Sequence, residues 1–156
     1  MVFIPRDPVV QNQFLVHDSS KGTTATAGAA VSLSASEKVE TVSGSNTKPY
    51  GFLMQNVKAE SSAHPTGFQL PGDLGSSDAF TGDPVGVAHL GLYDTTHYDT
   101  TQTYTAGDQL QVAADGKVTP SGSGNELHSD VVAVAQNTLD SNAVSAGRNL
   151  RIKLLI

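Results

Sequence analysis

The chain has 156 residues, the size of a single domain, and contains no cysteine, so it can form neither a disulfide framework nor a thiolate metal site. Its net charge of −6 argues against a nucleic-acid binder, and no apolar run is long enough to cross a bilayer. Ser, Thr, Gly and Ala are abundant, which disfavours long helices. Residues 1–7 have neither the basic nor the long apolar stretch of a secretory signal, so we expect a protein that is made and used in the cytosol, or that leaves it only inside a larger assembly.

Residues 1–18 have the pattern of an extended N-terminal arm. Pro5 and Pro8 fix φ and oppose a helix, while the surrounding apolar residues are too many for a solvated tail. We expect the arm to lie on a surface, either that of a partner or that of its own domain, which would comprise residues 19–156. The candidate contact residues are Val2, Phe3, Ile4, Pro5, Val9, Val10, Phe14 and Leu15.

The following 65 or so residues mix short strand signals with irregular chain. Residues 19–48 are rich in small and polar residues, but Val31 and Leu33, and then Val39 and Thr41, alternate with other residues and predict two short strands. The apolar run 50–57 predicts one strand that is buried on both faces. Residues 60–83 contain repeated Pro and Gly and predict a long loop.

The second half has stronger strand signals. Residues 84–93 predict a strand weakened by its glycines, and the alternation of 98–105 predicts another. Asp115-Gly116 between two alternating segments, 109–113 and 117–119, predicts a hairpin with a type I′ turn.

The chain ends with two further strands in this interpretation. Residues 130–135 predict a buried strand, and 150–156 an amphipathic strand with Arg151 and Lys153 on its polar face. Gly82-Asp83 and Gly107-Asp108 each precede a strand and suggest a repeated turn. The predicted fold class is therefore all-β, a small barrel or sandwich with long irregular loops and an extended N-terminal arm.

Motifs for chemistry are weak. No Gly-x-Ser-x-Gly elbow or phosphate-binding loop occurs. Asp94, His97 and Asp99, with His89 upstream, form the most site-like cluster, but an ordinary polar turn would carry the same residues. A second group, spaced too widely for a typical calcium loop, is Asp73, Asp78 and Asp83. We therefore predict no catalytic, cofactor or metal site, and a protein that is not an enzyme.

Charge is distributed unevenly along the chain. Residues 59–116 contain acidic side chains but no Lys or Arg. Side chains of one sign tend to stay solvated. We expect this stretch, including Asp73, Asp78, Asp83, Asp94 and Asp99, to supply much of a solvent-facing side.

Several segments resemble known virion proteins. Residues 48–57 look like a strand of tailed-phage virion proteins. Residues 106–119, then 131–135 and 146–154, are similar to the lambda-like phage head decoration proteins, also called capsid cement proteins. The shared features are a Gly-Asp turn, an Asp-Gly-Lys hairpin, a strand of small apolar residues and a closing strand.

The resemblance implies a structural protein of the virion. Members of this family sit as homotrimers on the outer surface of the capsid and stabilise the head by clamping neighbouring subunits. The implied partners are the major capsid protein and further copies of this chain, with no nucleic acid and no membrane.

Other classes of protein stay open. The chain would also suit a tail or fibre module that binds a receptor or carbohydrate, or a tail-tube component. Tyr50, Tyr93, Tyr98 and Tyr104 are the side chains that would stack on sugars.

Overall fold

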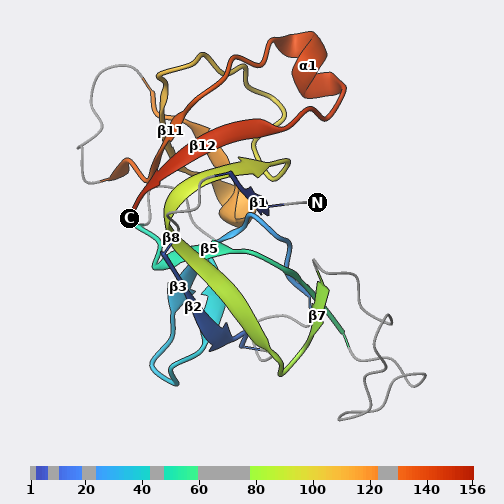
Figure 1. Cartoon of the computed structure of the whole chain (residues 1–156), viewed down its shortest axis with the longest axis vertical. Coiled ribbons are helices and arrows are strands. Elements are labelled where there is room, and N and C mark those ends of the chain that lie inside the picture. Colours follow the sequence, from blue (N-terminus) through green and yellow to red (C-terminus); the bar gives the residue numbers. More distant parts are fainter. Residues whose placement is uncertain (1–2, 7–10, 19–23, 43–47, 60–77, 123–129) are drawn as a thin grey trace.

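The computed structural model describes residues 3–6, 11–18, 24–42, 48–59, 78–122 and 130–156. In these residues it contains a large, curled antiparallel sheet, a small parallel sheet and a short α-helix (Figure 1). The predicted all-β fold class is confirmed.

The elements are short, with one exception. The large sheet contains β1 (Phe3–Pro5), β2 (Gln11–Val16), β3 (Ala30–Leu33), β4 (Val39–Thr41), β5 (Gly51–Leu53), β8 (Pro84–Thr95), β9 (Gln109–Val112), β10 (Val118–Pro120), β11 (Ala133–Ala135) and β12 (Leu150–Leu155). The small sheet pairs β6 (Asn56–Lys58) with β7 (Asp78–Phe80). The helical pieces are the turn η2 (Ala114–Gly116) and helix α1 (Ser141–Ser145).

Strand β8, with 12 residues, organises the large sheet. The strand order is β10-β9-β11-β12-β8-β5-β3-β4, and β1 and β2 also pair with β8. Residues 93–95 of β8 pair with both β1 and β12, and residues 87–88 pair with both β2 and β5. Since a strand has two edges, both edges of β8 are occupied at each of these places. In Figure 1, β8 runs from the end of the molecule that holds β7 into the half that holds α1.

Gly86, one of the glycines that were expected to weaken this strand, allows close packing, and so does Gly51 of the neighbouring strand β5. A Cβ atom on Gly86 would lie 3.1 Å from Met54 Sδ, and one on Gly51 of β5 would lie 2.5 Å from Val87 Cγ1. The absence of side chains therefore lets β5 and the residues that follow it lie directly against β8. The predicted strand 84–93 is present and extends two residues further, to Thr95.

The sheet formed by β3, β5 and β8 separates two hydrophobic clusters. Alternate residues face opposite sides, with Phe52 of β5 in one cluster and Leu53 in the other. In the same way, Ala88 of β8 faces the first cluster and Val87 the second. Burial on both faces, predicted for 50–57, is confirmed for β5. The prediction of one continuous strand is wrong, because the chain bends at residues 54–55 and continues as β6.

The prediction of a strand over 98–105 is also wrong. In this segment only Tyr98 and Tyr104 form isolated bridges, to Val118 and Leu139. The Asp99 carboxylate accepts hydrogen bonds from both the backbone N–H and the hydroxyl of Thr101 (2.9 and 2.7 Å), which turns the chain. The two tyrosines are buried edge to face, with ring centroids 5.4 Å apart. The alternation in 98–105 therefore reflects two buried tyrosines on either side of a turn and not a strand.

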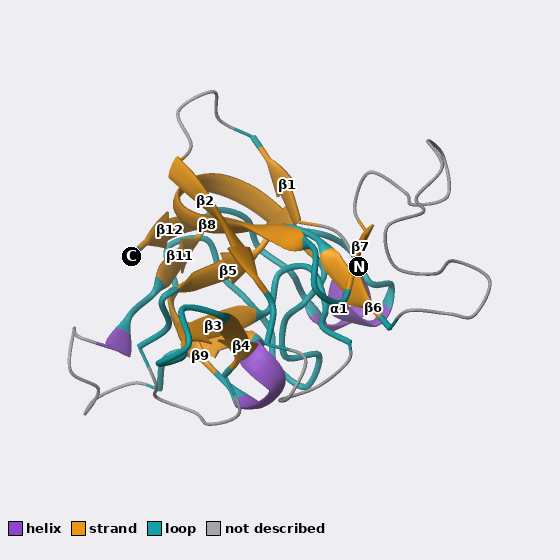
Figure 2. Cartoon of the chain, turned by 90° about the horizontal axis from the view of Figure 1, so that it is seen from below, coloured by secondary structure: helices purple, strands orange, loops and turns teal. Residues whose placement is uncertain are grey.

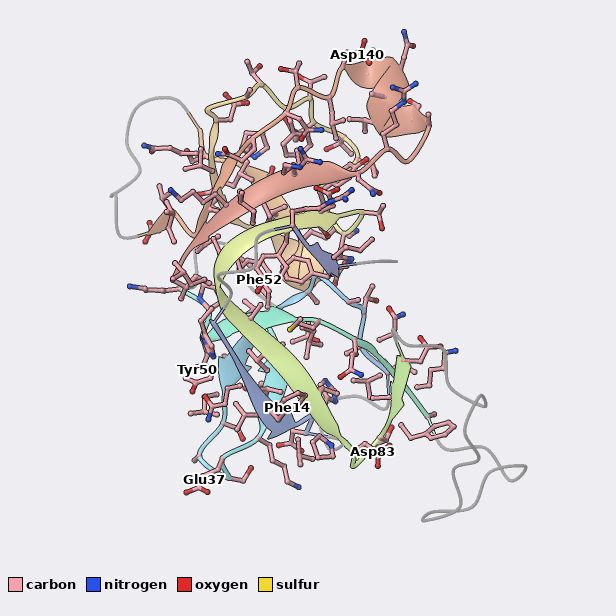
Figure 3. All side chains as sticks on the ribbon, viewed as in Figure 1. Phe14, Glu37, Tyr50, Phe52, Asp83 and Asp140 are labelled. Atoms are coloured by element: carbon pink, nitrogen blue, oxygen red, sulfur yellow. The ribbon has the colours of Figure 1, made fainter. Side chains whose placement is uncertain are left out.

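The turns predicted from glycine are confirmed. Asp115 and Gly116 have φ of 60° and 67°, as a type I′ turn requires, and the hairpin pairs Val112 with Val118. The Gly-Asp turns before β8 and β9 share one geometry. The N–H of Asp83 donates to Phe80 O at 3.0 Å, and that of Asp108 to Thr105 O at 2.9 Å. Each aspartate also accepts the N–H of that earlier residue. Figure 3 shows Asp83 at the end of the molecule away from Asp140.

Within the described residues, the N-terminal arm supplies two strands to the domain's own sheet. β1 and β2 both pair with β8 (Figure 2). The Phe3 ring is 5% exposed and stacks on Tyr93, with centroids 4.4 Å apart. These contacts match the interpretation in which the arm lies on its own domain. Val2, Val9 and Val10 lie outside the described residues.

The remaining candidate contact residues divide by exposure. Ile4 and Phe14 are exposed, with Phe14 69% accessible, whereas Leu15 is half-buried against the second cluster. Pro5 is the last residue of β1. Contact with a partner through the exposed members stays a prediction.

Truncating the two phenylalanines of the arm should have opposite consequences for stability. Phe3→Ala should lower the free energy of unfolding by about 3 to 5 kcal/mol, because it empties a buried site. Phe14→Ala, on the exposed side of β2, should change it by less than about 0.5 kcal/mol. Urea denaturation of both variants measures this. Equal, small effects would show that the arm adds nothing to the core.

Two glycines with nearly the same backbone test the contact between η2 and β3. Gly116 and Gly147 have φ of +67° and +64°, but a Cβ atom would lie 2.8 Å from the Ala30 backbone only at Gly116. Gly147→Ala should cost about 1 kcal/mol for the left-handed backbone. Gly116→Ala should cost about 2 kcal/mol more, because backbone atoms must also move. Thermal unfolding measures the difference, and equal costs would contradict close packing at this turn.

Candidate binding site

Asp94 is a buried carboxylate that lies between two arginines. The Asp94 side chain is 4% exposed, whereas those of Arg6 and Arg151 are 47% and 46% exposed. Arg6 Nε donates to Asp94 Oδ2 at 2.6 Å and Arg151 Nε to Asp94 Oδ1 at 2.9 Å. The three residues come from the end of β1, from β8 and from β12, so the carboxylate joins both ends of the chain to the central strand.

The arginines keep this carboxylate ionised. Burial opposes ionisation of Asp94, but hydrogen bonds and charge from Arg151 and Arg6 outweigh it and hold the Asp94 pKa below its usual value. The same contact raises the pKa of Arg151. The prediction that Asp94 faces solvent is therefore wrong: its carboxylate is buried between the two arginines. Two other aspartates of the stretch without Lys or Arg are Asp78, which pairs with Lys58, and Asp73, which lies outside the described residues.

All three arginines of the chain line one open pocket of about 390 Å³, the arginine pocket. Arg148 reaches it from the turn after α1. The Tyr98 hydroxyl donates to the Arg148 carbonyl at 2.7 Å, which holds this turn against the core. The rest of the lining is Asp94, Asn137, Thr138, Leu139, Ala143 and Asn149. Three guanidinium groups and one carboxylate give the lining a formal charge of +2 in a protein of charge −6.

The pocket continues into a sheet face that we call the outer face. Residues paired directly across antiparallel strands lie on the same face. Ile4 and Arg151 flank Asp94, Lys153 pairs with Leu92, and Leu155 pairs with Leu90. Of these side chains, the apolar ones exposed by 40% or more are Ile4, Leu90 and Leu155, and both basic ones are exposed. The outer face thus combines exposed aliphatic groups with positive charge.

The residues considered as metal ligands are engaged separately. His97 Nε2 lies 2.9 Å from the Asp115 carbonyl, and His89 Nδ1 lies 2.9 Å from the Tyr50 carbonyl. Asp83 accepts the Phe80 N–H in its turn. Within the described ranges, no three His, Asp or Glu side chains gather as a metal site would require.

Three of the four tyrosines considered for sugar stacking lie in the core. Tyr93, Tyr98 and Tyr104 are at most 2% exposed. Tyr50 is half-buried at the surface, packs edge-on against His89 and donates to Gln13 Oε1 at 2.7 Å. Of the four, Tyr50 is therefore the one placed to meet a ligand, and the carbohydrate-binding alternative stays a prediction.

The sequence patterns do not predict the arginine pocket. Its charged residues are separated by up to 145 positions, and only the alternation of 150–156 indicated that Arg151 is on an exposed face. Arg6 was considered only as part of the arm. The available signal was weak: the chain has only three arginines, and Asp94 directly follows the predicted strand 84–93.

No protein-family model matches the chain, and a search of curated proteins finds no similar protein. Among the described residues there is no helix that is long and apolar enough to span a membrane.

Removing the buried carboxylate should cost more than removing a more exposed one. Asp94→Ala should lower the free energy of unfolding by about 3 kcal/mol, because it separates β1 and β12 from their shared anchor and leaves two guanidinium groups facing each other. Asp78→Ala, which breaks the pair with Lys58 at the edge of the molecule, should cost about 1 kcal/mol. Urea denaturation at neutral pH compares the two. A cost for Asp94→Ala no larger than that for Asp78→Ala would contradict the anchoring role.

Proposed function

We propose that this chain is a structural protein of a tailed-phage virion, which binds the outer surface of the capsid as a homotrimer and stabilises the head by clamping neighbouring major capsid subunits. The observation that carries the proposal is the outer face, where exposed Ile4, Leu90 and Leu155 adjoin the arginine pocket. Exposed aliphatic side chains rimmed by charge are typical of a surface that binds protein.

The resemblance described from the sequence adds support. Its segments 106–119, 131–135 and 146–154 contain the hairpin β9–β10, strand β11 and strand β12. These strands are consecutive in the large sheet and end next to β8. The similar segments are therefore contiguous in space, and their last strand, β12, supplies Arg151 and Lys153 of the outer face.

The proposed clamping would result from several weak contacts that act together. A stable protein interface usually buries about 800 Å² on each partner, more than a few exposed side chains supply. A trimer presents three copies of the same face, and once one copy is bound the others attach at high effective concentration. Subunits held in this way separate only if several contacts break together.

Imaging of virions tests this function. Electron cryomicroscopy of particles from a phage that encodes this chain should show trimeric density on the outside of the head, at three-fold positions, and deletion of the gene should remove it. Heads without the protein should also release DNA at lower temperature. Density restricted to the tail or fibres, or single copies away from three-fold axes, would contradict the proposal.

A further inference from the structure

We propose that the arginine pocket and the outer face together bind an extended acidic-apolar segment of a partner protein. In this arrangement, a carboxylate side chain of the segment enters the pocket and aliphatic side chains that follow it lie along β8 and β12. The inference concerns the chemistry of the partner and holds whether or not that partner is a capsid protein.

The arginines retain hydrogen-bond donors for a second carboxylate. A guanidinium carries five N–H donors. Arg6 directs Nε and Nη2 at Asp94, and Arg151 directs Nε at it. Both side chains are about half exposed, so the rest of each guanidinium can be reached from outside. Among the described residues, Arg148 has no acidic partner within ion-pair distance, which leaves a whole guanidinium for a ligand.

The pocket is held in shape before any ligand arrives. Asp94 fixes two of the guanidinium groups from below. Asn137 links the chain before α1 to β12, because its Oδ1 accepts the Arg151 N–H at 2.7 Å and its Nδ2 donates to the Asn149 carbonyl at 3.1 Å. Side chains that are already ordered lose less entropy on binding, which favours a charge-assisted, bidentate contact with a carboxylate.

The aliphatic residues select a protein segment over other anions. A phosphate or small carboxylate would fill the pocket and leave Ile4, Leu90 and Leu155 uncovered. A nucleic acid would bring many phosphates to a protein of net charge −6 and few aliphatic groups. A peptide with a carboxylate and alternating leucines matches both features.

The spacing of the face defines the probe. Asp94, Leu92 and Leu90 mark three successive rows of the outer face, each two residues along β8. One such step is about 6.6 Å, the same as that between alternate residues of an extended peptide. The peptide acetyl-Asp-Ser-Leu-Ser-Leu-amide would therefore place its carboxylate at the pocket and its two leucines over the next rows.

The test is an NMR titration of the full chain, labelled with ¹⁵N and with ¹³C methyl groups, with this peptide. We expect saturable shifts of the Arg148 and Arg151 Nε–Hε signals and of the Leu90 and Leu155 methyl signals. A matched peptide with asparagine in place of aspartate should bind about tenfold more weakly, since a charge-assisted hydrogen bond is lost.

A variant pair isolates the pocket. Arg148→Ala leaves the Asp94 contacts intact and should weaken peptide binding about tenfold. Lys48→Ala removes one charge from an exposed residue that does not line the pocket and should leave the affinity unchanged.

Three results would overturn the inference. The first is equal binding of the aspartate and asparagine peptides, or no shift at these side chains at any peptide concentration tested. The second is inorganic phosphate shifting the arginine signals as strongly as the peptide does, while the leucine methyls stay unmoved, which would indicate a small-anion site. The third is tighter binding of a single-stranded oligonucleotide than of the peptide, with the same residues affected.

Discussion

The structure depends on the pairing of β8 along both of its edges. A strand of 12 residues would expose many backbone N–H and C=O groups if it were at the edge of a sheet. Here β1 and β12 cover residues 93–95, and β2 and β5 cover residues 87–88. The same strand supplies side chains to both hydrophobic clusters, so neither cluster is complete without it.

The outer face follows from this arrangement. Because β8 lies between β1 and β12, its residue Asp94 receives arginines from the two ends of the chain. A buried ion pair adds little net stability compared with an apolar contact, but losing one partner is costly. In this protein, the contact fixes positions: the Asp94 carboxylate holds two guanidinium groups at the surface, beside aliphatic side chains of the same sheet. The arginine pocket is thus the exposed side of the buried contact between Asp94 and the two arginines.

Local patterns predicted local structure well. The Asp115-Gly116 turn, the alternation of β12 and the double-sided burial of β5 each depend on neighbours in sequence, and all three are present. The exchange of partners along β8 was not predictable, because it depends on which distant strand reaches each edge. Tyr98 and Tyr104 show how a pattern can mislead, since a polar turn held by Asp99 separates two buried rings at strand-like spacing. The arginine pocket was not predictable either, because its residues come from distant parts of the chain: Arg6 and Asp94 are 88 residues apart.

Because β8 contributes to both clusters and to the outer face, these regions should unfold as one cooperative unit. Native-state hydrogen exchange in low concentrations of denaturant tests it most directly. We expect amides of residues 85–88 and of residues 92–95 to exchange with the same free energy, equal to that of global unfolding. Exchange of one group at a clearly lower free energy than the other would show that one end of the molecule opens alone and would contradict the account.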